Sequence, residues 1–206
     1  MKQKERIVRI TELAVLIAVL LLLEVTGLGM IRTFGLEMTI LQVPVIIGAI
    51  LLGQNNGAIL GVCFGLISFW ECLSGKSGFG ATLLAINPFF TFLMCVPTRT
   101  LMGWLCGLIF RITDNKLSNT KANIVPYITA SLSGALINTA LFMGTLCICF
   151  YNTPYIQGFA EKLHAENALI FIVLFVGIQG LIEAGVCAAL GTAISKAVRY
   201  ALHRNM

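Results

Sequence analysis

The sequence predicts an all-α integral membrane protein with about six transmembrane helices and with both the N- and the C-terminus in the cytoplasm. Three observations predict this fold class. Of the 206 residues, 58% are hydrophobic and 11% are charged, whereas a soluble globular domain usually carries about 25% charged residues. Apolar runs of about 20 residues, the length that crosses a bilayer, follow one another along the chain. The cations gather at the two ends and in one connector, which is typical of membrane orientation and not of nucleic-acid binding.

Six apolar runs are expected to form the spans of a single transmembrane domain over residues 1–206. The first run follows a basic segment, as in a signal peptide, but no cleavage site of small residues comes after it. We therefore interpret it as an uncleaved helix. Between the second and third runs, Gln54, Asn55 and Asn56 are expected to form a tight turn. The expected spans are about 8–30, 38–53, 57–72, 88–110, 124–150 and 167–193.

The distribution of Lys and Arg predicts the orientation. Ten of these residues fall on the side that holds both termini and the connector at 112–123, and three, Arg32, Lys76 and Lys162, fall on the other side. Because cytoplasmic segments of membrane proteins carry an excess of Lys and Arg, the termini are expected in the cytoplasm. The longer connectors then face outward, where an arriving ligand would meet them first. These connectors are 24–37, 73–87 and 151–166.

Small residues spaced four apart recur in the expected spans, and such spacing lets helices approach closely in lipid. Ordinary packing within the bundle explains most of these pairs. Ala14 and Ala18, in the first expected span, could instead contact a helix of another protein. The remaining small residues are Gly57, Gly61 and Gly65, then Gly103 and Gly107, then Ala184 and Ala188.

Polar residues at membrane depth form the candidate ligand site, because a polar side chain inside a bilayer is costly and faces the interior or a cavity. Asn138 lies in the middle of the fifth expected span. Gln179 and Glu183 lie one turn apart in the sixth span and share a helix face. Asn87 directly precedes the fourth span, whose end it could cap. Trp70 lies near the outer surface, where tryptophan often serves only as an interfacial anchor.

Structural roles remain open for three of these residues. Glu183 could form an internal ion pair with Arg99 of the fourth expected span instead of binding a ligand. Asn138 and Gln179 could form hydrogen bonds between helices.

The sequence shows no pattern of catalytic or metal-binding residues. Gly75-Lys76-Ser77 resembles the end of a phosphate-binding loop, but position 70, where that motif requires glycine, is Trp70. Asp114 is the only aspartate, and the seven cysteines lack metal-ligand spacing. We therefore expect no enzyme activity, no cofactor and no metal site, and interpret the chain as a binding or transport subunit.

Short motifs, in their order along nearly the whole chain, resemble the substrate-binding S components of energy-coupling factor (ECF) vitamin transporters. The pair Ala14 and Ala18 resembles the family's small-residue motif in the first span. The stretches 42–53 and 57–61 resemble its second and third spans. The later matches are Pro97-Thr98-Arg99 with Gly103, Gly134 with Asn138-Thr139, and Glu183-Ala184.

The resemblance implies a subunit of an ABC-type importer in the bacterial plasma membrane that captures a small water-soluble vitamin. Its partners would be a membrane-embedded coupling (T) protein, which docks on the face of Ala14 and Ala18, and two cytoplasmic ATPases. The family's ligand site corresponds here to Asn87, Asn138, Gln179 and Glu183, with Trp70 at the rim and Arg32, Glu37 and Lys76 as candidate lids.

Pantothenate is the vitamin that we expect. The only tryptophans are Trp70 and Trp104, whereas a large flat ring would want aromatic stacking partners. Pantothenate is an anion, for which Arg99 or Lys76 would supply a cation; a pyridoxine-like or other small vitamin is the alternative.

Two further classes of protein stay open. One is a self-sufficient small-solute channel or secondary transporter. Such proteins often show internal repeats, and the two halves of this sequence show no convincing repeat. The other is a small membrane enzyme that depends on Glu183.

Overall fold

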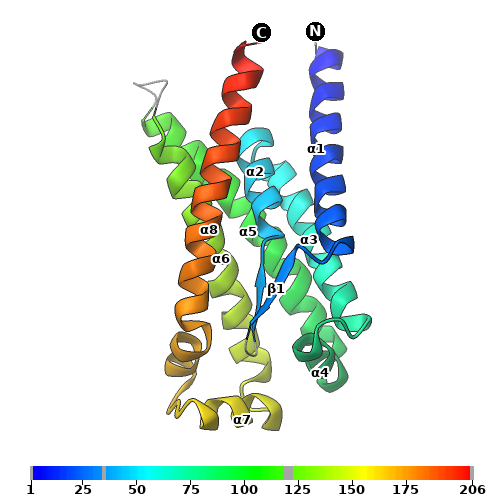
Figure 1. Cartoon of the computed structure of the whole chain (residues 1–206), viewed down its shortest axis with the longest axis vertical. Helices are drawn as coiled ribbons and strands as arrows, with labels where there is room; N and C mark the ends of the chain where they lie inside the picture. The colour runs from blue at the N-terminus through cyan, green and yellow to red at the C-terminus, as the bar shows by residue number, and fades with distance from the viewer. Residues whose placement is uncertain (1, 34–35, 118–122, 205–206) are drawn as a thin grey trace.

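Long helices run side by side along one axis in this computed structural model, which describes residues 2–33, 36–117 and 123–204. Both chain termini lie at one end of the bundle, and two short helices, α4 and α7, lie at the opposite end (Figure 1). The helices are α1 Lys2–Val25, α2 Gln42–Leu52, α3 Gln54–Leu73, α4 Gly78–Ile86, α5 Pro88–Lys116, α6 Val125–Phe150, α7 Pro154–Lys162 and α8 Ala168–Arg204.

A β-hairpin follows the first helix, so the all-α prediction is incomplete and the predicted helical run 8–30 is too long. Helix α1 ends at Val25, and Gly27 turns the chain with φ of +71°. Strand β1 (Met30–Thr33) then pairs antiparallel with β2 (Leu36–Thr39), Met30 opposite Thr39. The second predicted run, 38–53, likewise begins in this strand. A short apolar run is compatible with either structure, and its periodicity does not separate helix from strand.

The tight turn predicted at Gln54, Asn55 and Asn56 is wrong, because all three residues lie in the first turn of α3. A single residue, Gly53, separates α2 from α3, with φ of 90° and ψ of 172°. Glycine adopts this conformation without the steric cost that a Cβ would add. The two helices therefore meet at one exposed glycine, close to the end of the bundle that carries the termini (Figure 1).

Two of the connectors predicted to face outward contain a helix of their own. Helix α4 lies within 73–87, and α7 lies within 151–166. Each begins at a hydroxyl cap: Ser77 Oγ accepts a hydrogen bond from the Gly80 N–H at 3.1 Å, and Thr153 Oγ1 accepts one from the Ile156 N–H at 3.4 Å. Such caps satisfy N–H groups that lack partners within the helix.

Four helical segments are long and apolar enough to cross a membrane, judged by length and composition among the described residues: Gln54–Leu73, Pro88–Lys116, Val125–Phe150 and Gly180–Ala201. Two shorter apolar helices, Gln42–Leu52 and Ala168–Gly177, add to them. Gly177 divides α8 with a non-helical φ of 42°. Helix α1 carries Arg9, Glu12 and Glu24 along its apolar stretch. The chain is thus a helical membrane protein, while the count of six spans stays a prediction.

Glycines hold α3 against α5. A Cβ on Gly61 would lie 2.3 Å from the Arg99 carbonyl oxygen, and one on Gly103 would lie 2.1 Å from the Gly57 carbonyl oxygen. No side chain fits at such distances from a backbone. The small residues in these two helices therefore serve packing inside the bundle.

Candidate functional site

A buried hydrogen-bond cluster joins the start of α2 to the middle of α8. Gln42 is fully buried, and its Nε2 donates to Glu183 Oε1 at 2.6 Å and contacts Cys187 Sγ at 3.1 Å. The strand that precedes Gln42, β2, also packs against α8. Gln42 Oε1 has no hydrogen-bond partner among the described residues. The hairpin, α2 and α8 thus meet at one polar point.

Gln42 was not among the predicted site residues, although it belongs to a stretch that matched the family. It follows Leu41 and precedes a run of apolar residues that ends at Leu52. The criterion that selected Asn138, a polar group within an apolar run, would have selected Gln42 as well. Gln42 lay inside the expected span 38–53, but it was treated there only as part of the family resemblance and not as a polar group at membrane depth.

Arg99 is buried in α5, with 7% of its surface exposed. Its Nη1 donates to the Cys95 carbonyl oxygen at 3.2 Å, and its guanidinium lies 4.7 Å from the ring centroid of Phe64 and 5.3 Å from that of Phe142. Arg99 Nε has no hydrogen-bond partner within the described chain. Aromatic faces stabilise a cation but leave its N–H edge available to an anion.

Arg99 and Glu183 influence each other electrostatically without direct contact. Within the described ranges, Lys76 pairs with Glu24 and Arg199 pairs with Asp114, whereas no ion pair joins Arg99 to Glu183. Glu183 is held by Gln42 instead. The internal Arg99–Glu183 pair that the sequence left open is therefore not formed, and both charges stay free of a direct ionic partner in this region.

Asn138 lies on α6 at the same level of the bundle. It is 7% exposed, and its Oδ1 has no partner among the described residues. One turn earlier, Gly134 packs so closely on Ile46 that a Cβ there would lie 3.0 Å from Ile46 Cγ1. Helices α2 and α6 run in opposite directions (Figure 1), so one turn from this contact α2 presents Gln42 and α6 presents Asn138. Buried polar atoms without partners are rare in proteins, so Asn138 Oδ1 is a candidate acceptor for a bound molecule.

The structure does not bring Asn87 and Trp70 into this cluster. Asn87 caps α5, with its Oδ1 accepting from the Phe90 N–H at 3.1 Å. It precedes Arg99 by 12 residues, which is about 18 Å along a helix. Trp70 is 63% exposed, the placement of an interfacial anchor.

Other predicted residues are only partly described. The side chain of Gln179 lies outside the described residues, although its backbone belongs to α8. The side chains of Arg32 and Glu37 lie outside them too, while their backbones pair in the hairpin. Lys76, the third candidate lid residue, bonds Glu24 Oε1 at 2.8 Å and so ties the connector after α3 to the end of α1.

An aromatic cluster closes the end of the bundle opposite the termini. Phe79 of α4 lies 5.9 Å from Tyr155 and 6.2 Å from Phe159 of α7, and 5.9 Å from Phe175 of α8. Phe171 stacks on Phe175 at 4.9 Å. We call these five residues the outer aromatic cluster. It links both short helices to α8.

Ala14 and Ala18 lie on an exposed face of α1. The opposite face of α1 packs on α2 and α3, with Leu20 fully buried. The small residues of this helix therefore do not serve packing within the chain, unlike Gly61 and Gly103. Large apolar side chains surround them on the exposed face, including Ile10, Val15, Leu21, Leu22 and Val25.

Groups of three or more His, Cys, Asp and Glu side chains that could hold a metal ion are absent from the described part of the chain. Its seven cysteines are free thiols.

Comparison with known proteins gives a consistent result. Residues 8–195 match the family described as "ECF transporter, substrate-specific component". The chain is 26% identical over 178 residues to the pantothenic acid transporter PanT of Lactococcus lactis subsp. cremoris, covering 80% of this chain and 86% of that protein. It is 40% identical over 76 residues to the pantothenate transporter PanT of Leuconostoc mesenteroides, covering 37% and 35% respectively. This chain therefore belongs to the family of ECF transporter substrate-specific components, multi-pass proteins of the cell membrane that take part in transport and not in catalysis.

Proposed function

We propose that this chain captures pantothenate outside the cell and delivers it to an ECF importer as the substrate-binding membrane subunit. Two relatives named as pantothenate transporters support the choice of vitamin. The observation that carries the proposal is the polar cluster of Gln42, Arg99, Asn138 and Glu183, in which three buried side chains and the half-buried Glu183 come from four helices of an apolar bundle.

The proposed orientation places both termini in the cytoplasm, with six spans. Figure 1 shows both ends of the chain at one end of the bundle, which an even number of crossings requires. The basic residues of the first and last helices gather there, in agreement with the excess of cations on the cytoplasmic side of membrane proteins. The hairpin, α4 and α7 would then face outward and surround the entry path.

The cluster offers pantothenate complementary groups. The unpaired Nε of Arg99 would donate to the vitamin's carboxylate, and a charge-assisted bond of this kind is about twice as strong as a neutral one. Gln42 Oε1 and Asn138 Oδ1 are acceptors without partners, which suits the hydroxyl and amide N–H donors of the vitamin. Glu183 would face the hydroxyl end, because two carboxylates repel each other.

The partner proposal follows from the family. A membrane-embedded coupling protein, driven by two cytoplasmic ATPases, would dock on the α1 face around Ala14 and Ala18. Support comes from the exposure of these two alanines, since small residues with no packing role inside the chain permit close approach of another helix.

A thermal-shift assay on the purified chain tests the proposed function. Pantothenate at about 100 times its dissociation constant is expected to stabilise the folded protein by about 2.7 kcal/mol. Pyridoxine and riboflavin serve as comparison ligands and are expected to leave the unfolding temperature unchanged. If pyridoxine alone stabilises the protein, pyridoxine and not pantothenate is the substrate. If no water-soluble vitamin raises the unfolding temperature, the vitamin-binding proposal is wrong. Uptake into liposomes by the chain alone would favour a self-sufficient transporter.

A further inference from the structure

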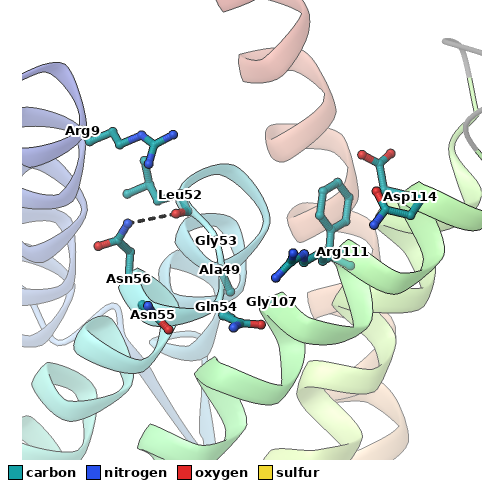
Figure 2. Close-up of a pocket in the computed structure, with 12 residues that line it drawn as sticks. Arg9, Ala49, Leu52, Gly53, Gln54, Asn55, Asn56, Gly107, Arg111 and Asp114 are labelled. Atoms are coloured by element: carbon teal, nitrogen blue, oxygen red, sulfur yellow. Dashed lines mark hydrogen bonds between the residues drawn. The ribbon is translucent and has the colours of Figure 1, made fainter. Parts of the chain in front are cut away.

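A second polar pocket, of about 390 Å³, lies where α1, α5 and the junction of α2 and α3 meet (Figure 2). It is near the end of the bundle that carries both termini, away from the polar cluster proposed to bind the vitamin. None of Gln42, Arg99, Asn138 and Glu183 lines it. The pocket is lined mainly by polar and charged side chains, namely Arg9, Gln54, Asn55, Asn56, Arg111 and Asp114.

The charge of the pocket is positive. Arg9 of α1 and Arg111 of α5 extend toward the Gly53 junction from two sides (Figure 2). In the part of the chain that the structure describes, neither arginine has an ion-pair partner. Asp114 also lines the pocket, but its Oδ2 accepts from Arg199 Nη2 at 3.0 Å, so a cation outside the lining compensates its charge. Two guanidinium groups that have no ion-pair partner among the described residues therefore line one cavity.

The first turn of α3 adds backbone donors to this charge. Helix α3 begins at Gln54, and its N-cap residue, Gly53, has no side chain with which to satisfy the first N–H groups. Such groups, together with the helix dipole, attract anions. Asn56 Nδ2 donates to the Leu52 carbonyl oxygen at 2.9 Å, which holds the turn in place. Arginines and helix N–H groups thus point to the same kind of ligand.

One acceptor in the pocket is available to a donor from a ligand. Gln54 Oε1 is buried and has no hydrogen-bond partner within the described residues. A bare anion cannot satisfy it, whereas a hydroxyl group can. The pocket therefore combines recognition of an anion with recognition of a hydroxyl.

We propose that this pocket binds a phosphate group, with Arg9 and Arg111 as its ligands and with Gln54 accepting from a hydroxyl next to the phosphate. Arginine pairs with phosphate through parallel N–H bonds. Basic pockets between membrane helices at a bilayer surface are suited to anionic headgroups, and a glycerol phosphodiester headgroup carries both the phosphate and the hydroxyl. Free phosphate supplies the same anion but lacks the neighbouring glycerol hydroxyl.

The full chain is placed in two kinds of nanodisc, one of pure phosphatidylcholine and one of phosphatidylcholine and phosphatidylglycerol in equal parts. Native mass spectrometry then counts the phospholipid molecules that the chain retains. The wild-type chain is expected to retain phosphatidylglycerol and not phosphatidylcholine. The double variant Arg9→Gln, Arg111→Gln is expected to lose this retention by at least about tenfold, since each charged hydrogen bond contributes substantially. The matched control is Arg6→Gln, Lys116→Gln, which removes the same charge from the same two helices outside the pocket lining and is expected to behave as wild type.

Titration of inorganic phosphate into the detergent-purified chain, followed by calorimetry, distinguishes the two sources. Binding of phosphatidylglycerol without free phosphate identifies a lipid headgroup, and saturable binding of both identifies a general phosphate site; either result supports the pocket. Equal retention of the two lipids together with no heat from phosphate would overturn the proposal, as would equal losses in the pocket and control variants. If the double variant does not fold, the test is whether soluble glycerol 3-phosphate displaces phosphatidylglycerol from the wild-type chain. Displacement supports the site, and absence of displacement counts against it. Pantothenate stabilisation, measured in parallel, reports on the vitamin site independently.

Discussion

Gln42 and Glu183 are separated by 141 positions in the sequence, yet Gln42 Nε2 lies 2.6 Å from Glu183 Oε1. The contact joins the first turn of α2 to the middle of α8, and so closes the bundle around its polar interior. Each of these side chains would be costly alone at membrane depth. Together they satisfy each other in part and leave Gln42 Oε1 available.

Replacing Gln42 with leucine should weaken both the fold and ligand binding. Gln42→Leu removes the donor to Glu183 and leaves a half-buried carboxylate without this partner, which costs about 1–3 kcal/mol. We expect a lower unfolding temperature and a pantothenate affinity reduced by about tenfold or more, measured by thermal shift and calorimetry. Gln3→Leu, at an exposed position of α1, is the control and should change neither. Wild-type affinity in Gln42→Leu would separate this residue from the ligand site.

Asn138→Ala and Glu183→Gln should each weaken pantothenate binding and leave membrane insertion intact. Asn138→Ala removes an acceptor without an internal partner, so the folded chain loses little while the complex loses a hydrogen bond, worth about 0.5–1.5 kcal/mol. Glu183→Gln retains the shape and an acceptor for Gln42, but it removes the charged acceptor proposed for the vitamin's hydroxyl groups, and a charge-assisted hydrogen bond is about twice as strong as a neutral one. Affinity is measured by calorimetry, and insertion by the yield in the membrane fraction. Unchanged affinity in both variants would remove the polar cluster as the site.

Gly61→Ala should destabilise the bundle although alanine favours helix formation. The added Cβ would lie 2.3 Å from the Arg99 carbonyl oxygen, so α3 and α5 must separate, and such overpacking costs about 1–3 kcal/mol. Gly144→Ala on α6 is the control, because nothing lies within 4 Å of its added Cβ, and it is expected to be neutral or slightly stabilising. The comparison is made by thermal unfolding in detergent. Equal stability of the two variants would show that the α3–α5 contact tolerates separation.

The double variant Ala14→Trp, Ala18→Trp should block coupled transport and spare ligand binding. Both positions are exposed on α1, so the indole rings would not disturb the bundle but would prevent close approach of a partner helix. Vitamin uptake by cells expressing the whole transporter, compared with binding by the purified chain, separates the two effects. Leu132→Trp, Leu136→Trp is the control, since this pair is exposed with the same spacing on α6. Uptake at wild-type rate in the Ala14, Ala18 variant would mean that the coupling protein docks elsewhere.

Phe79→Ala should accelerate release of bound pantothenate. This ring contacts Tyr155, Phe159 and Phe175 at the outer end of the bundle, and its loss would detach α4 from α7 and α8. Most differences in affinity between related complexes arise in the dissociation rate, so stopped-flow dissociation is the suitable measurement. Phe89→Ala, a truncation at a residue 68% exposed, should release the ligand at the wild-type rate. Identical rates in both variants would place the ligand's path away from the outer aromatic cluster.

Several features of the fold follow from local sequence. Long apolar runs predict helices because only internally hydrogen-bonded segments are stable in lipid, and α5 and α6 begin within one residue of the predicted starts at 88 and 124. The hairpin at 30–39 and the single-residue break at Gly53 were missed. The hairpin depends on pairing between two short segments, and the break depends on one residue's φ, so neither leaves a periodic pattern in the sequence.

The sequence predicted only part of the candidate site, because a residue can be recognised from sequence only where its significance does not depend on its contacts. Asn138 and Glu183 are recognisable as polar residues within apolar runs, whatever they contact. For Asn87 and Trp70 the sequence offered both ligand binding and a structural role, and only the structure shows that Asn87 caps α5 and that Trp70 is exposed.

The sequence by itself determined the class of the protein. Composition, run length and the order of short motifs need no knowledge of contacts, since the bilayer acts on each segment separately. Only the tertiary structure decided that Gln42 holds Glu183, that Arg99 rests on Phe64 and Phe142, and that Arg9 and Arg111 share a pocket. These relationships join residues far apart in the chain, and their energies arise from distances that exist only once the helices have packed together.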